Sequence, residues 1–212
     1  FSGKFMGLIG NSVWVASAAA LVSAAAALWL AYAERLYPQR LVRGGVRVAT
    51  LGYAVPGLVL AVALMLPMTS LDKWIATQLR DVFEIRWGLL LTGTSAALIF
   101  VYVARFLTVA FNSTQAGLTQ IHPQFDAAAR SLGQSPRGVL RRVHLPLLRP
   151  AILSGLLLVF IDVMKELPAT LILRPFNFET LATWVYRYAA DERLAEASTA
   201  ALVIVLVSPV SY

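Results

Sequence analysis

Long apolar runs, separated by short charged segments, dominate the chain. Residues 5–33 and 48–71 carry no charge, 87–104 is a shorter uncharged run, 150–173 holds three charges, and a fifth run begins at Ala197. A helix needs ~20 apolar residues to cross ~30 Å of hydrocarbon. A bilayer admits only helices or closed barrels, and these runs lack the strict alternation of barrel strands. The pattern therefore predicts an all-α polytopic membrane protein with about five transmembrane helices.

The charged segments between the runs predict the orientation of the chain. Segment 34–47 has four Arg and one acid, and segment 105–149 has six Arg and one acid. Segment 72–86 has three basic and three acidic residues, and segment 174–196 has three basic and four acidic residues. Cytoplasmic loops carry an excess of Lys and Arg. We therefore expect 34–47 and 105–149 in the cytoplasm, with the N-terminus of this segment outside and its C-terminus cytoplasmic.

Composition excludes an ordinary soluble domain. Hydrophobic residues make up 58% of the chain and charged residues only 14%, against about 25% charged in soluble domains. There is no cysteine for a disulfide or a thiolate metal site, and two histidines are too few for an all-His metal cage. The net charge of +7 would also suit nucleic acid. Its distribution indicates membrane topology instead, so we expect contact with lipid and no nucleic-acid partner.

The second run carries two local features. Pro56 lacks a backbone donor and should kink or locally unwind the helix, either as a packing kink or as a moving part of a translocation path. Beyond it, Ser70–Phe83 has an apolar stripe at helical spacing. We expect that segment to lie on the membrane interface or to cap the outer mouth.

A polar and basic stretch, Gln124–Pro146, lies between two apolar runs and predicts a loop with two short helices. The second helix should run from about Pro136 to Val143 and stop before Pro146, because proline restricts the residue ahead of it. The boundary signals are Pro123 at a first helical position, Gly133 as a C-terminal cap, and Ser135 before Pro136 as an N-cap with proline at N1.

The faces of that second helix differ. Val139, Leu140 and Val143 share one side, whereas Arg137 and Arg141, four residues apart, share another. So short a helix is marginal by itself in water. We therefore expect it to dock on a protein partner.

The spacing of Ala128, Ala129, Gly133, Val143, Leu145 and Pro146 resembles the "EAA" loop of ABC importer permeases. In that family the loop carries a coupling helix that docks into a groove of the ATPase subunit. The family pattern has Glu where this chain has Ala127 and Ile where it has Val143. Asp126 would point about 100° away on a helix, so it replaces that Glu poorly, and we expect this half to couple less firmly than its partner half. The expected ATPase-coupling residues are Ala128, Ala129, Gly133, Ser135, Pro136, Arg137, Val139, Leu140, Val143, Leu145 and Pro146.

The fourth run contains charges at membrane depth. Asp162 and Lys165 are spaced i, i+3 and Asp162 and Glu166 i, i+4, which predicts one shared face with a net negative charge. Pro168 should break the helix and free carbonyl groups. Two interpretations remain open: an ion-pair cluster that locks the helix against its neighbours, or a lining for the path of a cationic substrate formed by Asp162, Lys165, Glu166 and Pro168.

The run Lys165–Tyr186 resembles the permease branch that imports ferric iron, with relatives for thiamine and phosphonates. The resemblance implies a bacterial inner (plasma) membrane location and an ATP-driven importer, with ferric iron as the expected substrate and thiamine, phosphonate or polyamine as alternatives. The implied partners are a cytoplasmic ABC ATPase dimer, a second permease half or copy, and a periplasmic substrate-binding protein. It implies no cofactor on this chain, because ATP and Mg²⁺ belong to the ATPase.

Segment 174–196 is the expected contact for the binding protein. It mixes both signs of charge with aromatic side chains such as Phe176, Trp184 and Tyr188, and such a mixture suits partner docking. Aromatic residues near a membrane boundary also form interface belts, so a purely lipid-facing role stays open.

Soluble catalytic motifs are absent: there is no phosphate-binding G-x-x-x-x-G-K-S/T loop, no H-E-x-x-H and no G-x-S-x-G. We therefore expect a non-catalytic transport subunit, without catalytic or metal-binding residues. An ion-coupled secondary transporter is the rival interpretation, because such carriers also use broken helices and midplane charges, but it has no need of an ATPase-docking loop. We expect residues 1–212 to form one transmembrane domain of a longer or two-half permease, with 108–150 as its coupling loop.

Overall fold

The computed structural model describes residues 2–83 and 91–207, and every regular element in these ranges is helical. Four helices are long and apolar enough to cross a membrane, and α10 is a shorter apolar helix. The prediction of an all-α polytopic membrane protein is confirmed. The elements are α1 (Ser2–Leu36), α2 (Arg40–Ala49), a 3-10 turn η1 (Gly52–Ala54), α3 (Gly57–Phe83), α4 (Ser95–Gln120), α5 (Gln124–Ser131), α6 (Pro136–Val139), a π turn η2 (Leu140–His144), α7 (Leu145–Lys165), α8 (Pro168–Leu173), α9 (Leu181–Ala190) and α10 (Leu194–Val207).

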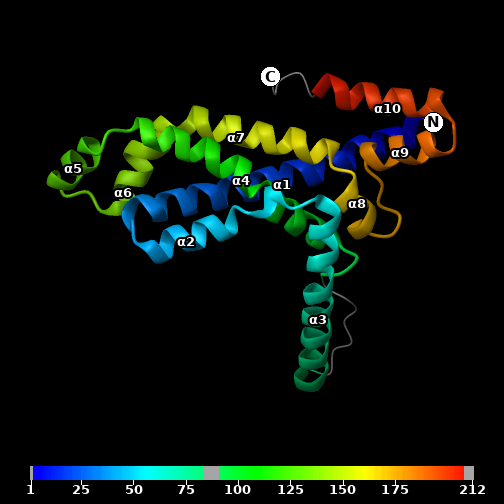
Figure 1. Cartoon of the computed structure of the whole chain (residues 1–212), viewed down its shortest axis with the longest axis horizontal. Coiled ribbons are helices and arrows are strands. Elements are labelled where there is room, and N and C mark those ends of the chain that lie inside the picture. The colour runs from blue at the N-terminus through cyan, green and yellow to red at the C-terminus, as the bar shows by residue number, and fades with distance from the viewer. Residues whose placement is uncertain (1, 84–90, 208–212) are drawn as a thin grey trace.

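Helices α1, α4 and α7 lie side by side and form the core of the molecule (Figure 1). Small side chains on α1 permit close approach of its neighbours; Ala16, Ala19, Ala20 and Ala27 have no exposed surface. Between α4 and α7, a Cβ added at Gly155 would lie 3.3 Å from Cα of Ala110. The three helices therefore pack with their backbones close together.

The two ends of this bundle differ. Helices α5 and α6 lie at one end, which we call the loop end, and α8, α9 and the N-terminus lie at the other (Figure 1). Segment 34–47 also leaves α1 at the loop end, where α2 follows. The two segments predicted to be cytoplasmic thus share one end of the molecule.

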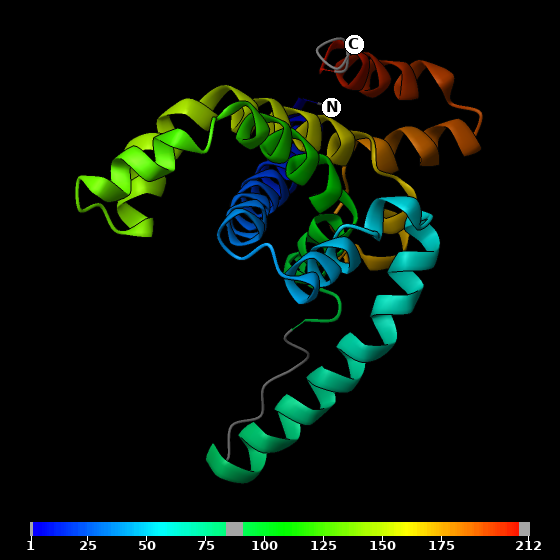
Figure 2. The same cartoon turned by 60° about the vertical axis from the view of Figure 1, so that its left-hand side comes forward.

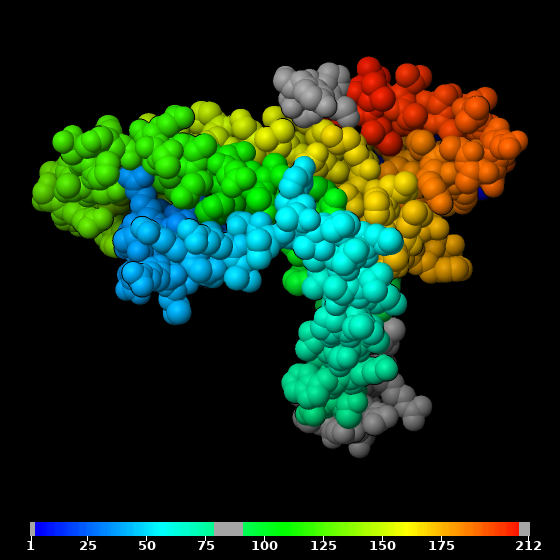
Figure 3. Space-filling model, viewed as in Figure 1, coloured from blue at the N-terminus to red at the C-terminus, as the bar shows by residue number. Residues whose placement is uncertain are grey.

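Helix α3 stands clear of the bundle and runs across the direction of α1, α4 and α7 (Figures 1 and 2). The space-filling view shows it projecting from the rest of the molecule (Figure 3). Only 17% of its most apolar window is buried, against 33–44% in the other three long helices. Its exposed apolar side chains include Leu58, Val59, Val62, Met65, Leu66, Leu71 and Trp74.

The second run differs in part from its prediction. Of the two alternatives for Pro56, the helix is locally unwound rather than kinked: the chain forms the η1 turn before it, and α3 begins at Gly57. Proline fits directly before a helix because its missing N–H removes no bond there. Ser70–Phe83 is not a separate interfacial helix but continues α3, which extends to Phe83. The side chains of residues 79–83 lie outside the described part of the chain.

The third membrane helix lies later in the sequence than predicted. Within the described residues α4 runs from Ser95 to Gln120, so Arg105 is inside a helix rather than in the cytoplasmic loop. A single charge shortened the apparent run, although an apolar helix tolerates a paired charge. Residues 87–90 of the predicted span, Glu84 and Arg86 of the predicted outer segment, and 208–212 of the fifth run lie outside the described residues.

The helix that begins at Pro136 does not stop before Pro146, as the sequence predicted. It passes through the η2 turn into α7, so that 136–165 forms one continuous helical stretch. Pro146 falls in the first turn of α7, directly after the π turn. A π turn changes the register of the backbone bonds, and the missing N–H of Pro146 falls at this change.

Candidate functional site

The polar loop folds with the predicted boundaries at its turn. Gly133 has φ +77, and the amides of Gly133 and Gln134 donate to the carbonyl oxygens of Arg130 at 2.9 Å and Ala129 at 3.0 Å. These two bonds are those of a Schellman C-cap with glycine at C′. Ser135 Oγ accepts from the Gly138 amide at 3.3 Å and caps α6, with Pro136 at N1. Both caps are confirmed.

At the start of the loop, the cap lies one residue from its predicted place. Pro123 is the N-cap of α5 rather than its first residue, and α5 begins at Gln124.

The apolar face predicted for ATPase docking is only partly exposed. Val139 is 2% exposed and Ala129 is also buried, so these two side chains support the loop from inside. This corrects the expected place of Val139 on the apolar docking face. Leu140 and Val143 are half-buried, while Ala128, Arg137 and Leu145 are exposed. Gly133, Ser135 and Pro136 are exposed at the turn, and Pro146 is exposed farther along.

Sequence reasoning missed two large apolar side chains on this loop. Phe125 is 54% exposed and Leu132 is 80% exposed. Phe125 lies on α5, and Leu132 is the C-cap of that helix. The sequence signal that would have found them is a large apolar residue within an otherwise polar and basic loop.

A partly buried polar group joins the loop to α1. The Arg35 guanidinium donates through Nε and Nη2 to Oδ2 of Asp126, at 3.0 and 2.8 Å. It also donates to the carbonyl oxygens of Leu118 at 2.7 Å and Ile121 at 2.9 Å, at the end of α4. The negative C-terminal end of the α4 dipole stabilises the Arg35 cation. The positive N-terminal end of the α5 dipole stabilises the Asp126 carboxylate, which lies in the first turn of α5.

Two aromatic side chains complete this group. The Tyr32 hydroxyl donates to the Pro136 carbonyl oxygen at 2.6 Å, and its ring meets the edge of the His144 ring at 5.4 Å. His144 is 1% exposed, and its Nε2 lies 2.6 Å from Oδ1 of Asp126. We call Tyr32, Arg35, Asp126 and His144 the loop-anchor cluster.

The three charges predicted to share one face separate into two pairs. Lys165 Nζ lies 3.4 Å from Oδ1 of Asp162, in a partly exposed pair. Glu166 is the C-cap of α7 with non-helical backbone angles, so the i, i+4 relation to Asp162 is lost. It pairs instead with Arg105 on α4, Nε to Oε2 at 3.4 Å. The predicted net negative charge is therefore wrong, because each acid faces a base.

Two breaks between helices, one before α3 and one between α7 and α8, meet at the Arg105–Glu166 pair. Arg105 Nη1 donates to the Val55 carbonyl oxygen at 2.8 Å, before α3. Glu166 Oε1 accepts from the Ala169 amide at 3.3 Å, at the start of α8. Pro168 opens α8 and breaks the helix as predicted. A Cβ at Gly57 would clash with Glu166 Oε1 and lie 2.9 Å from Arg105 Nη1, so only glycine leaves room for the pair.

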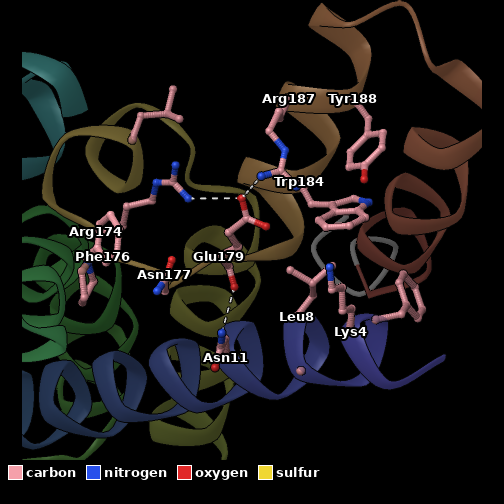
Figure 4. Close-up of a pocket in the computed structure, with 14 residues that line it drawn as sticks. Lys4, Leu8, Asn11, Arg174, Phe176, Asn177, Glu179, Trp184, Arg187 and Tyr188 are labelled. Atoms are coloured by element: carbon pink, nitrogen blue, oxygen red, sulfur yellow. Dashed lines mark hydrogen bonds and ion pairs between the residues drawn. The ribbon is translucent and has the colours of Figure 1, made fainter. Parts of the chain in front are cut away.

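A large cavity lies at the end opposite the loop. Its volume is about 1,020 Å³, and Figure 4 shows α1 on one side and the segment around α9 on the other. Arg174 and Arg187 both reach Oε1 of Glu179, and the Asn11 amide donates to the Glu179 carbonyl oxygen at 3.1 Å. The guanidinium of Arg187 also lies 5.0 Å from the Trp184 ring. We call this the N-terminal pocket; its lining includes Lys4, Phe176, Asn177 and Tyr188.

The N-terminal pocket carries an excess of positive charge. Its charged side chains are Lys4, Arg174, Arg187 and Glu179. Among the residues of 2–83 and 91–207, no group of three or more His, Cys, Asp or Glu side chains is arranged to hold a metal ion.

Known proteins resemble this chain in sequence and in fold. A family model described as "Binding-protein-dependent transport system inner membrane component" matches residues 23–211. The Fe(3+)-transport system permease protein FbpB 2 of Haemophilus influenzae is 31% identical over 205 residues, which are 97% of this chain and 37% of that protein. A putative 2-aminoethylphosphonate transport system permease protein, PhnV of Salmonella typhimurium, is 37% identical over 109 residues, 51% of this chain and 39% of that protein. The chain thus spans less than two fifths of the length of these relatives.

Solved structures share the fold. A chain of a bacterial alginate ABC transporter, in complex with an alginate pentasaccharide-bound periplasmic protein, gives a TM-score of 0.74 at 15% identity and covers 96% of this chain and 75% of that chain. A chain of the inward-facing MetNI methionine ABC transporter gives a TM-score of 0.62 at 17% identity, covering 98% and 94%.

Proposed function

Because the chain belongs to the family of binding-protein-dependent transport system inner membrane components, we propose that it is a permease unit of an ATP-driven ABC importer. The observation that carries this proposal is the loop of α5 and α6. Its two capped short helices present Phe125 and Leu132 to solvent, as a docking site for a separate ATPase requires. An ion-coupled carrier has no use for such a site.

The proposed complex contains partners that supply what this chain lacks. A dimer of cytoplasmic ATPases binds ATP and Mg²⁺ and docks at the loop end. A soluble periplasmic binding protein delivers the solute at the end that holds the N-terminal pocket, and a second permease half or copy completes the path. The unit itself is non-catalytic and lies in the bacterial inner membrane, with the loop end toward the cytoplasm.

Ferric iron is the first candidate solute, because the relative that matches 97% of the chain is a Fe(3+)-transport permease. An anionic solute such as a phosphonate is the second. The three cations and one carboxylate of the N-terminal pocket favour a negatively charged group, and another relative is a putative 2-aminoethylphosphonate permease. The same charge disfavours cationic solutes, a polyamine and free ferric iron alike, so the case for ferric iron rests on the relative alone.

The test is transport by the assembled complex in lipid vesicles. We expect uptake of the solute carried by the binding protein to require ATP hydrolysis and to persist after proton and sodium gradients are collapsed. Uptake that follows an ion gradient and ignores an ATPase inhibitor would instead support a secondary transporter. A complex with a hydrolysis-deficient ATPase is the matched control.

The solute is tested in the same vesicles. Ferric iron, thiamine and 2-aminoethylphosphonate are each supplied with the binding protein, and ATPase activity is measured. We expect stimulation by ferric iron and none by the other two; stimulation by the phosphonate would favour the second candidate.

A further inference from the structure

The loop-anchor cluster joins elements that are far apart in sequence. Arg35 and Asp126 are 91 residues apart, and Tyr32 and Pro136 are 104 residues apart. Tyr32 and Arg35 lie on one turn of α1, near its end at Leu36. That single turn contacts the end of α4, the first turn of α5, the start of α6 and the η2 turn.

These contacts are strong enough to hold the loop in place. The side chains of Arg35 and Asp126 are 18% and 14% exposed, so solvent screens them only partly. Hydrogen bonds in which the donor or the acceptor is ionised are about twice as strong as neutral ones. Arg35 makes four such bonds to two elements, and its planar guanidinium fixes their direction.

By contrast, the apolar contacts that hold this loop are few. Of the large apolar side chains in α5 and α6, Val139 is buried and Phe125 is exposed. Helix α5 is eight residues long, too short to be stable alone, whereas α6 continues through η2 into α7. The position of α5 relative to the bundle therefore depends on the polar contacts to α1.

We propose that Arg35 and Asp126 are positioning residues that make the docking loop and the loop end of α1 move as one rigid body. The proposal rests on the proposed function, in which an ATPase docks on this loop. Helix α1 packs against both α4 and α7. A displacement of the docked loop is therefore transmitted through Arg35 to the core of the bundle rather than absorbed by bending of the loop.

This assignment also explains the role of Asp126. The ABC-permease loop pattern has a carboxylate at the position of Ala127, and Asp126 does not replace it. Its carboxylate instead points inward, to Arg35 and His144. Asp126 acts inside the permease and Ala127 remains exposed on the docking side.

The first test measures a distance in the intact complex. The chain has no cysteine, so spin labels at Tyr37→Cys and Ser131→Cys, both on exposed residues, report the end of α1 and the end of α5. We expect one narrow distance that is the same with and without ATP. Arg35→Gln and Asp126→Asn should broaden it, while Asp126→Glu should keep it narrow.

The second test measures coupling. Asp126→Asn and Arg35→Gln should lower the solute transported per ATP hydrolysed several-fold, with assembly and melting temperature of the complex retained. Glu34→Gln and Arg40→Gln remove the same charges next to the cluster without touching it and should match the parent. Glu34 and Arg40 have no ion-pair partner within the described ranges 2–83 and 91–207.

The outcomes separate the two proposals. A label distance that shifts with ATP in the parent, or that stays narrow in Asp126→Asn, overturns the rigid-body role. A lower coupling ratio accompanied by loss of assembly also overturns it, because the residues would then serve folding alone. Absence of ATP-driven transport in the parent complex refutes the proposed function, whereas the label distances still test the rigid-body role.

Discussion

At the scale of single residues, charge at membrane depth is the feature that most affects this chain. Glu166 is 8% exposed and Arg105 19% exposed, and they neutralise one another across α4 and α7. Removing one member of a buried pair leaves the other without compensation, which costs about 3–5 kcal/mol. The pair is therefore required for stability, whether or not it also takes part in transport.

We predict that Glu166→Gln destabilises the protein by about 3 kcal/mol, because Arg105 loses its counter-charge. Glutamine keeps the size of the side chain and an oxygen for the Ala169 amide, so the change isolates the charge. The measurement is the melting temperature in detergent. Asp162→Asn is the matched control, since the Asp162–Lys165 pair is partly exposed and exposed pairs contribute about 0–1 kcal/mol. Equal melting temperatures for the two variants would contradict the prediction.

At the scale of elements, substitutions in the turn between α5 and α6 distinguish the effect of backbone strain from the effect of ATPase docking. Gly133 has φ +77, and a Cβ there would have no atom within 4 Å. Any L side chain other than Asn or Asp pays about 1–2 kcal/mol for that conformation, yet none meets an obstacle in this chain. Bulk at this position matters only if a partner covers it.

We predict that Gly133→Leu uncouples the ATPase while membrane insertion stays intact. Gly133→Ala carries the same backbone penalty with little bulk, and Gly133→Asn relieves that penalty, so both should retain most coupling. The measurement is the ratio of solute transported to ATP hydrolysed. If Leu and Ala reduce this ratio equally, strain rather than docking is responsible; full coupling in Gly133→Leu would remove the turn from the ATPase contact.

The 3-10 turn before α3 shows a second constraint on an element. A Cβ at Gly52 would overlap the carbonyl oxygen of Ala104 on α4. Thr108 Oγ1 donates to the Thr50 carbonyl oxygen at 2.6 Å, so η1 lies directly against α4. This close approach anchors the beginning of α3 to the bundle, even though the rest of the helix leaves it.

At the scale of the whole molecule, α3 is the element without a full set of neighbours. Within the described residues it contacts α8 and α4, and most of its large apolar side chains are exposed. A helix that runs across the other three cannot cross the same bilayer in parallel with them. Under the proposed function, a second permease half is the partner that we expect to cover this face.

We predict that α3 packs on a second permease half or copy in the complex. A photoreactive label attached at Val62→Cys or Leu66→Cys, in a chain without other cysteines, should cross-link to permease protein. Val62 is 48% exposed and Leu66 72% exposed. A label at Ala61→Cys, which is buried in the chain, is the control. Capture of lipid alone at both exposed positions would contradict this packing.

The sequence alone was sufficient for features that depend on local spacing. The apolar runs identified the membrane class because the bilayer imposes a length on every span. The caps at Gly133 and Ser135 followed from residues within one turn of them, since capping bonds reach only three to five residues. The helix break at Pro168 was equally local.

Only the tertiary structure decided which distant groups meet. Arg35 and Arg105 each counted as one positive charge of a cytoplasmic segment, yet one anchors the loop to α1 and the other neutralises Glu166 inside the bundle. Helical spacing put Val139 on a docking face, but packing of α6 against the bundle buried it. A charge or an apolar face can be satisfied by any complementary group that the fold brings near, so its partner cannot be read from local spacing.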